Sequence, residues 1–313
     1  MIHKRLALCV AAVLWIFSVG HGQEVCAADL LVSSGGTHQV LRYDETTGAF
    51  VGVFASGGGL ATPFGLDIGP DGNLYVGSAG TNSVKRYNGG TGAFINEFVT
   101  PGSGGLNSPR GLTFGQSGDL YVSSFVNNRI QRYDGLTGAP LGTFATGPLS
   151  APTGLTFGPD GNLYVASQNS SNVQRFNGAT GAFIDIFASG GGLVNPRDLT
   201  FGPDGNLYVG SLNDRVIRYN GATGAHIDTF ASGGGLGASQ GVLFGPDGDL
   251  YAAAQTNNKV IRFNGATGAL IGDFATGGGL TTPTYMVFMP EPGTLGLLAL
   301  GGMMVLRRRD EAV

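Results

Sequence analysis

Short apolar segments alternate with polar turns along most of the chain. The pattern is clearest at Leu155–Phe157, Leu163–Ser167, Asn172–Phe176 and Ala182–Phe187. Pro, Asp, Asn and Gly separate these segments; proline presets φ for a tight turn and glycine accepts a positive φ. Each segment has the length of an ordinary β-strand, and no segment has the periodicity of a long amphipathic helix. The pattern therefore predicts four short antiparallel strands in this part of the chain.

This unit of four segments returns about every 44 residues. Each copy contains a triplet similar to Leu-Tyr-Val, and successive triplets are 44, 46, 43, 44 and 43 residues apart. The triplets are centred on Leu31, Tyr75, Tyr121, Tyr164, Tyr208 and Tyr251. A fixed period of this length is typical of solenoids, propellers and arrays, and four antiparallel strands per unit form the blade of a β-propeller. An all-β propeller is the prediction, and an open solenoid is the alternative.

Six copies of the first strand set the number of blades. They are Gly65–Ile68, Gly111–Phe114, Gly154–Phe157, Asp198–Phe201, Gly241–Phe244 and Tyr285–Phe288. The repeats nevertheless begin at a second strand, Leu30–Ser33, and end at a first strand. We therefore expect the last strand to complete the first blade, because this closure leaves no unpaired strand edge between the ends. The predicted fold is a six-bladed β-propeller of four-stranded antiparallel blades over residues 28–289.

The repeat resembles a known class of propeller. The segment GLTFGPDGNLYV, residues 154–165, and the segment NRIQRYD, residues 128–134, carry the similarity. They resemble NHL repeats and the related gluconolactonase-like and streptogramin-lyase-like six-bladed propellers, and the similarity extends from Asp29 to Phe288. The resemblance implies the fold. It does not select a function, because this scaffold serves sensors, hydrolases, lyases and interaction modules.

The N-terminal residues follow an export pattern. Lys4 and Arg5 precede an apolar run, Leu6–Val19, and small residues follow up to Ala28. This order is typical of a secretory signal peptide, which we place at residues 1–27. Its removal takes away both cysteines of the chain, so the mature protein would contain no disulfide. Lipid attachment at Cys26 is the alternative.

The C-terminal residues 290–313 follow a second targeting pattern. A Pro-Glu-Pro triplet, an apolar run from Leu295 to Leu306 and a basic end succeed one another. They resemble the PEP-CTERM sorting signal of Gram-negative bacteria, which implies an exosortase-type protease as partner and a transient attachment to the inner membrane. The triplet and the basic end consist of Pro290, Glu291, Pro292, Arg307, Arg308 and Arg309. We expect export to the cell surface or the extracellular matrix, and whether the segment is cleaved or retained stays open.

The charge of the repeats limits the possible partners. Residues 28–290 carry 12 basic and 17 acidic side chains, a net charge near −5. The basic residues are spread over the repeats, which argues against a nucleic-acid surface. One arginine returns in every copy before an aromatic residue, and six equivalent copies indicate a structural role. These arginines are Arg42, Arg86, Arg132, Arg175, Arg218 and Arg262.

Positions that differ between the copies predict where a ligand would bind. Alternating strands place the Pro-Asp-Gly and Asn-Gly-Ala-Thr-Gly turns on one face, and the loops between second and third strands on the other. The second face carries the variable polar residues, and the residues just before the first strands lie near the channel mouth. The predicted ligand-binding residues are Arg110, Arg197, Gln240, Asn127, Asn128, Asn169, Asn213, Asp214, Asn257 and Asn258. Ordinary polar loops are the alternative.

Catalytic and metal-binding residues are few. The mature chain contains only His38 and His226, which we expect on opposite faces, and it offers no Ser-His-Asp set and no cysteine. The streptogramin-lyase pattern needs histidines with an acid and a metal, so this sequence does not assemble it. Asp198 with Asn213 and Asp214 would make at most a weak calcium site. We therefore expect no catalytic residue, metal or cofactor, and favour a non-catalytic binding or interaction protein, for exopolysaccharide or another surface protein. A metal-dependent lyase or lactonase-like hydrolase is the alternative.

Overall fold

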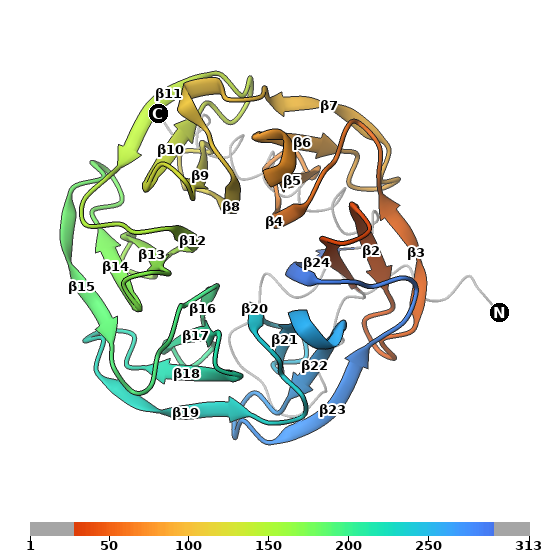
Figure 1. The fold of residues 1–313 in the computed structure, drawn as a ribbon, viewed down its shortest axis with the longest axis vertical. Helices are drawn as coiled ribbons and strands as arrows, with labels where there is room; N and C mark the ends of the chain where they lie inside the picture. The colour runs from red at the N-terminus through yellow and green to blue at the C-terminus, as the bar shows by residue number, and fades with distance from the viewer. Residues whose placement is uncertain (1–27, 291–313) are drawn as a thin grey trace, which may run out of the picture.

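The computed structural model describes residues 28–290, which form six four-stranded antiparallel sheets arranged in a ring (Figure 1). In this part of the chain, the only helical elements are three short 3-10 turns, at Ala79–Thr81, Ser103–Gly105 and Gln255–Asn257. The structure confirms the predicted all-β fold with six blades. The proposed signal peptide and the residues after Pro290 lie outside the described residues. None of the described helices is long and apolar enough to cross a membrane.

Each blade runs from an inner strand near the central axis to an outer strand at the rim (Figure 1). The inner strands are β4 (Pro63–Ile68), β8 (Pro109–Phe114), β12 (Pro152–Phe157), β16 (Leu199–Phe201), β20 (Ser239–Phe244) and β24 (Pro283–Pro290). The second strands are β1 (Ala28–Ser34), β5 (Leu74–Ser78), β9 (Leu120–Ser124), β13 (Leu163–Ser167), β17 (Leu207–Ser211) and β21 (Leu250–Ala254). The third strands are β2 (Gln39–Tyr43), β6 (Ser83–Tyr87), β10 (Arg129–Tyr133), β14 (Asn172–Phe176), β18 (Arg215–Tyr219) and β22 (Lys259–Phe263). The outer strands are β3 (Phe50–Ala55), β7 (Phe94–Val99), β11 (Pro140–Ala145), β15 (Phe183–Ser189), β19 (His226–Ser232) and β23 (Leu270–Ala275).

The C-terminal strand closes the ring. Strand β24 pairs antiparallel with β1, with Leu30 opposite Phe288 and Val32 opposite Met286. The first blade therefore has the order β24-β1-β2-β3 and combines both ends of the described chain. This pairing confirms the predicted closure.

Aromatic side chains join neighbouring blades. The ring of Tyr75 on β5 packs edge-to-face on Phe98 of its own blade and on Phe114 of the next, with 4.8 Å between centroids in both pairs. Equivalent pairs surround Tyr121, Tyr164, Tyr208 and Tyr251. Each such pair contributes about 0.5–1.5 kcal/mol beyond the area that it buries. The tyrosine of the repeated triplet is therefore a core residue between blades.

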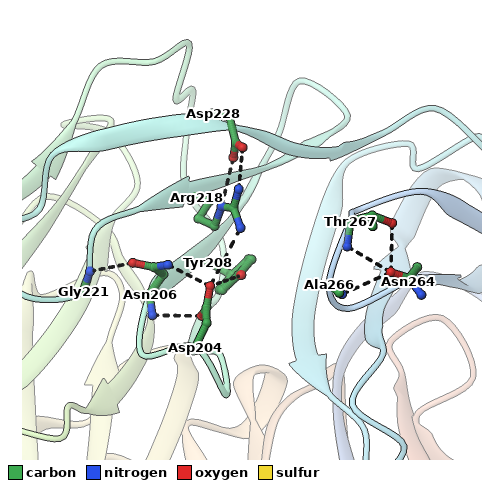
Figure 2. A network of polar contacts seen from close by, with 9 residues as sticks. All are labelled: Asp204, Asn206, Tyr208, Arg218, Gly221, Asp228, Asn264, Ala266 and Thr267. Atoms are coloured by element: carbon green, nitrogen blue, oxygen red, sulfur yellow. Dashed lines mark hydrogen bonds and ion pairs between the residues drawn. The ribbon is translucent and has the colours of Figure 1, made fainter.

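Close packing explains the repeated Asn-Gly-Ala-Thr-Gly turn. The side-chain oxygen of Asn264 accepts hydrogen bonds from the backbone amides of Ala266 and Thr267, which fixes the turn (Figure 2). The final glycine, Gly268, has φ of +72°, and a Cβ there would lie 1.8 Å from the carbonyl oxygen of Phe230 in the preceding blade. Only glycine fits, because the backbone conformation and the neighbouring strand both exclude a side chain.

The repeated arginine has a structural role, as expected. In Figure 2, Arg218 forms an ion pair with Asp228, with 2.6 Å between Nη2 and Oδ2. Its Nη1 lies 3.8 Å from Oδ2 of Asp204. Tyr208 donates to the same Asp204 carboxylate at 2.9 Å, and the guanidinium lies 5.0 Å from the Phe230 ring centroid. The other five arginines also form ion pairs with aspartates of their own blades.

Candidate binding site at the channel mouth

We call the loop end of the ring's axis the channel mouth. Each blade contributes one equivalent residue there, which is the second residue of the inner strand in five blades and lies two residues before β16 in the other. In chain order these residues are Phe64, Arg110, Thr153, Arg197, Gln240 and Thr284. The inner strands approach one another closely here: a Cβ on Gly65 would lie 2.6 Å from the carbonyl oxygen of Arg110. Backbone therefore forms the wall of the channel, and the side chains that differ between blades give the mouth its chemistry.

Arg110 is held between two aromatic rings. Its guanidinium carbon lies 3.7 Å from the ring centroid of Phe64 in the preceding blade and 4.7 Å from that of Phe125 after β9. The Nε atom is buried and has no hydrogen-bond partner among residues 28–290. Burial, together with the charge of Arg197, lowers the pKa of Arg110 to about 10. The side chain therefore remains charged at neutral pH, with one donor unused.

Arg197 is positioned from two sides. Its Nη1 donates to Oε1 of Gln168 at 2.7 Å, and its backbone carbonyl accepts from the amide of Gly154 and the hydroxyl of Tyr285. Its Nε, like that of Arg110, is buried without a partner in the described chain. Burial lowers the pKa of this arginine as well. Arg110 and Arg197 thus form a pair of partly buried cations on blades separated only by that of Thr153.

The other residues of the mouth differ in how they are used. Gln240 donates to Gln255 at 2.8 Å and is almost fully buried. Thr153 and Thr284 are buried and donate to the carbonyls of Pro196 and Pro63 in the next blade, both at 3.0 Å. The threonines therefore join blades, whereas Gln240 orients the side-chain amide of Gln255.

Two acids line the inside of the channel. The carboxylate of Asp198 accepts from the amide of Val242 at 3.1 Å, and that of Asp67 accepts from the amide of Phe114 at 3.0 Å. Both residues are partly buried. The loss of water around the carboxyl groups raises the pKa of Asp198 to about 7 and that of Asp67 to about 6. These acids bridge neighbouring inner strands and make no ion pair with an arginine of the described chain.

Three of the predicted asparagine-loop residues connect blades. Asn128, Asp214 and Asn258 have φ between 53° and 63° and each accepts a hydrogen bond from a backbone amide of the following inter-blade connection, at 2.7–2.8 Å. His38, Asn82 and Ser171 make the same contact in the other blades. Six equivalent contacts define what we call the inter-blade clamp. Its left-handed backbone and its polar acceptor explain why Asn and Asp are frequent at this position.

The neighbouring asparagines hold the glycine-rich connections. Asn127, Asn213 and Asn257 each donate from the side-chain amide to a glycine carbonyl, at 2.7–3.0 Å. Asn169 is exposed, and its side chain makes no hydrogen bond with another described residue. The structure thus places Arg110, Arg197 and Gln240 at equivalent positions of three different blades, and it uses six of the seven predicted Asn and Asp residues for hydrogen bonds to the backbone. Phe125 and Tyr285 were missed, although Tyr285 occupies a position that is glycine in four other copies.

The described residues contain no group of three or more His, Cys, Asp or Glu side chains that could hold a metal. The three residues of the calcium hypothesis use their side-chain oxygens in other contacts. Asp198 accepts from the amide of Val242, Asp214 accepts from that of Ala238 in the inter-blade clamp, and Asn213 accepts from the hydroxyl of Ser211 at 2.6 Å. Their oxygens are thus used separately. One cavity of about 350 Å³ lies on the turn face and is lined by Gln116, Ser117, Tyr121, Arg132, Phe157, Gly161, Gly178 and Ala179.

Solved structures with the same fold include proteins of different kinds. The nidogen/laminin complex aligns with a TM-score of 0.71 at 18% identity, covering 84% of this chain and 98% of that one. A protein of unknown function from Bacteroides caccae aligns at 0.66 and 14% identity, covering 85% and 100%. Virginiamycin B lyase from Staphylococcus aureus aligns at 0.54 and 21% identity, covering 73% and 77%. No family model and no curated protein matches the sequence. These similarities establish the β-propeller fold alone.

Proposed function

We propose that this protein is an exported, non-catalytic binding protein whose propeller presents the channel-mouth face to a polysaccharide or another surface protein. The observation that carries the proposal is the pair Arg110 and Arg197, two partly buried cations that form no ion pair within residues 28–290 and lie on the face where the blades differ. On the opposite face, the repeated arginines and acids are used in internal networks such as that in Figure 2. Arg86 on that face also has a buried Nε without a partner, but its Nη1 forms an ion pair with Asp71, whereas Arg110 and Arg197 have no acid partner within residues 28–290. A face with unpaired cations is the one that gains most from an anionic ligand.

The proposal includes a route to the cell surface. The resemblance to NHL-type repeats, the N-terminal export pattern and the PEP-CTERM-like ending together support a protein that crosses the inner membrane, is held there briefly and is then released by an exosortase-type protease. Pro290, Glu291 and Pro292 would form the recognition sequence, and the three terminal arginines would stay on the cytoplasmic side. The final location would be the cell surface or the extracellular matrix.

Footprinting tests the proposed binding face. The purified full chain would be labelled with hydroxyl radicals, with and without a panel of acidic and neutral bacterial polysaccharides. We expect protection of Phe125 and the loops around Gln168 and Gln255. Protection restricted to the Pro-Asp-Gly and Asn-Gly-Ala-Thr-Gly turns would reject this face.

Metal analysis tests the alternative function, a metal-dependent lyase or lactonase-like hydrolase, which we consider because the fold is similar to that of virginiamycin B lyase. We expect less than one divalent ion per chain after dialysis, and no turnover of a lactone or of a streptogramin. One bound ion per chain, together with turnover that a chelator abolishes, would replace the binding protein with a metal-dependent enzyme.

A further inference from the structure

Arg110 and Arg197 differ from the repeated arginines of the blades in having no acid partner. Each repeated arginine forms an ion pair with an aspartate of its own blade, whereas neither of these two forms one with any residue of 28–290. The Nε atom of both is buried and unbonded within the same range. These Nε atoms are too buried to meet a ligand, but neither Nη atom of Arg110 donates to a residue of 28–290, and Arg197 donates only from Nη1, to Gln168. The two positive charges also repel each other. An anionic ligand would remove both costs.

The surroundings of the two arginines favour a planar oxyanion. Phe64 and Phe125 pack on the guanidinium of Arg110, at 3.7 and 4.7 Å from its central carbon, so aromatic contacts fix its orientation. Gln168 fixes the other guanidinium through one nitrogen only, at 2.7 Å. The edge of a guanidinium matches the two oxygens of a carboxylate, which it binds with parallel hydrogen bonds.

Two glutamines follow second strands on the loop face, and one of them, Gln168, contacts Arg197. Gln168 and Gln255 are partly exposed at the starts of loops that border the mouth, and Gln240 orients Gln255 through a 2.8 Å hydrogen bond. A side-chain amide both donates and accepts, so it can bind a hydroxyl group in either sense. Two guanidinium groups next to partly exposed amides offer sites for a carboxylate and for several hydroxyls together.

We propose that the channel mouth binds a uronic-acid residue of an acidic polysaccharide, with Arg110 and Arg197 on the carboxylate and Gln168 and Gln255 on the sugar hydroxyls. This inference rests on the proposed function, because it names the ligand class of the same face.

The rest of the protein favours this polymer over other anions. A net charge near −5 over residues 28–290, with the basic residues spread over the blades, argues against a nucleic-acid chain as the polymer. A peptide would usually add a strand to an open sheet edge. At the mouth, the inner strands already bond one another, as in the 2.8 Å contact from the amide of Gly154 to the carbonyl of Arg197. Side-chain recognition of a sugar needs no open edge.

Titration calorimetry on the full chain tests the inference with matched ligands. The probes are oligomers of galacturonate, glucuronate and mannuronate, the same oligomers with every carboxylate reduced to an alcohol, and poly-glutamate of equal charge. The variants are Arg110→Gln, Arg197→Gln and the double substitution. Arg129→Gln is the control: this arginine on β10 makes no ion pair within residues 28–290, and its Nε donates to the carbonyl of Asn127 at 3.3 Å.

We expect at least one oligouronate to bind, its reduced form to bind at least tenfold more weakly, and the double variant to lose binding while keeping its melting temperature. The control should bind like the unchanged protein. Equal binding of the reduced oligomer, or unchanged binding by the double variant, would overturn the inference. The proposed function would still stand if the footprint of a polysaccharide lay at the channel mouth. Equal affinity for poly-glutamate would overturn the choice of a sugar. If no oligouronate binds, the inference also fails, and the footprinting panel decides the proposed function separately.

Discussion

The hydroxyl of Tyr285 donates a hydrogen bond to the backbone carbonyl of Arg197, with 3.0 Å between the two oxygens. Tyr285 lies on β24, Arg197 precedes β16, and β20 stands between these strands in the ring (Figure 1). One side chain thus connects the strand that closes the ring to a residue of the candidate site. The equivalent position of four other blades is glycine, where a Cβ would meet the neighbouring inner strand. The closure of the propeller and the position of Arg197 are therefore coupled.

Substitution Tyr285→Phe should weaken this coupling. Removing the hydroxyl keeps the ring but loses one buried hydrogen bond, so we expect the free energy of unfolding to fall by about 1 kcal/mol. Binding at the channel mouth should weaken severalfold, because Arg197 loses one of its backbone contacts. Urea denaturation and ligand titration measure the two effects. Tyr251→Phe is the control, since its hydroxyl bonds Asp247 within its own blade and should change stability without changing binding.

Truncation before Thr284 should open the ring. The shortened chain leaves β1 without its partner β24 and exposes apolar residues of β1 that this pair buries, among them Leu30 and Val32. We expect a lower and broader melting transition and concentration-dependent association, because an open strand edge can pair with another chain. Calorimetry and size-exclusion chromatography report these changes. A cooperative transition at an unchanged temperature would contradict closure by β24.

Substitutions in the inter-blade clamp should lower stability. Asn128→Ala removes an acceptor for the amide of Ala151 and places alanine at φ of 53°, a conformation that alanine disfavours. We expect a loss of about 1–3 kcal/mol in the free energy of unfolding. Asn169→Ala, at an exposed side chain without a hydrogen bond to the described residues, should change it by less than about 0.5 kcal/mol. Equal effects in urea denaturation would show that the clamp does not stabilise the ring.

The clamp also shows what the sequence could and could not predict. The repeat period, the turn residues and the strand lengths predicted the blades and their closure, because these features depend on local conformation. Asn128, Asp214 and Asn258 were assigned to ligand binding because they differ between copies, yet each bonds a backbone amide 23 or 24 residues further along the chain. Different residues satisfy one requirement there, an acceptor on a left-handed backbone. The six equivalent polar residues before the third strands were the available signal.

The location of Arg110, Arg197 and Gln240 at the starts of inner strands could be predicted from strand direction, and their role in binding stays a prediction. Arg110, Arg197 and Gln240 stand next to positions where the backbone of neighbouring blades nearly touches, so their side chains can only extend toward the mouth or along the wall. The aromatic contacts of Arg110 could not be predicted, because Phe125 comes from a loop whose path depends on packing between blades.

Cleavage of the C-terminal segment is a prediction about the protein in its own envelope. If an exosortase-type protease acts at the Pro-Glu-Pro triplet, the mature chain should end near Pro290–Pro292 and lack the apolar run and the three arginines. The run Leu295–Leu306 has 12 residues, fewer than the roughly 17–25 of a comfortable membrane span, which suits a temporary attachment. Intact-mass measurement decides the matter. Chains that still end at Val313 in cells with the protease would indicate a permanent anchor.

Stability should depend on pH through Asp198. Its pKa is about 7 in the folded protein against an ordinary value of 3.8, so between these values the folded carboxyl keeps a proton that the unfolded chain has lost. Raising the pH through this window therefore lowers the free energy of unfolding, and above pH 7 the loss becomes constant. Asp198→Asn removes this dependence and still offers an oxygen to the amide of Val242.

We therefore expect the variant to gain stability over the unchanged protein between pH 4 and pH 7, reaching about 2 kcal/mol once the accessible side of the carboxyl is allowed for. Asp67→Asn provides an internal comparison. Its carboxyl has a pKa of about 6, so its gain should be smaller and should level off one pH unit earlier. Urea denaturation from pH 4 to pH 9 measures both curves. A constant difference between Asp198→Asn and the unchanged protein over this range would mean that Asp198 is ionised throughout, and that the charge at this end of the channel is one unit more negative than inferred.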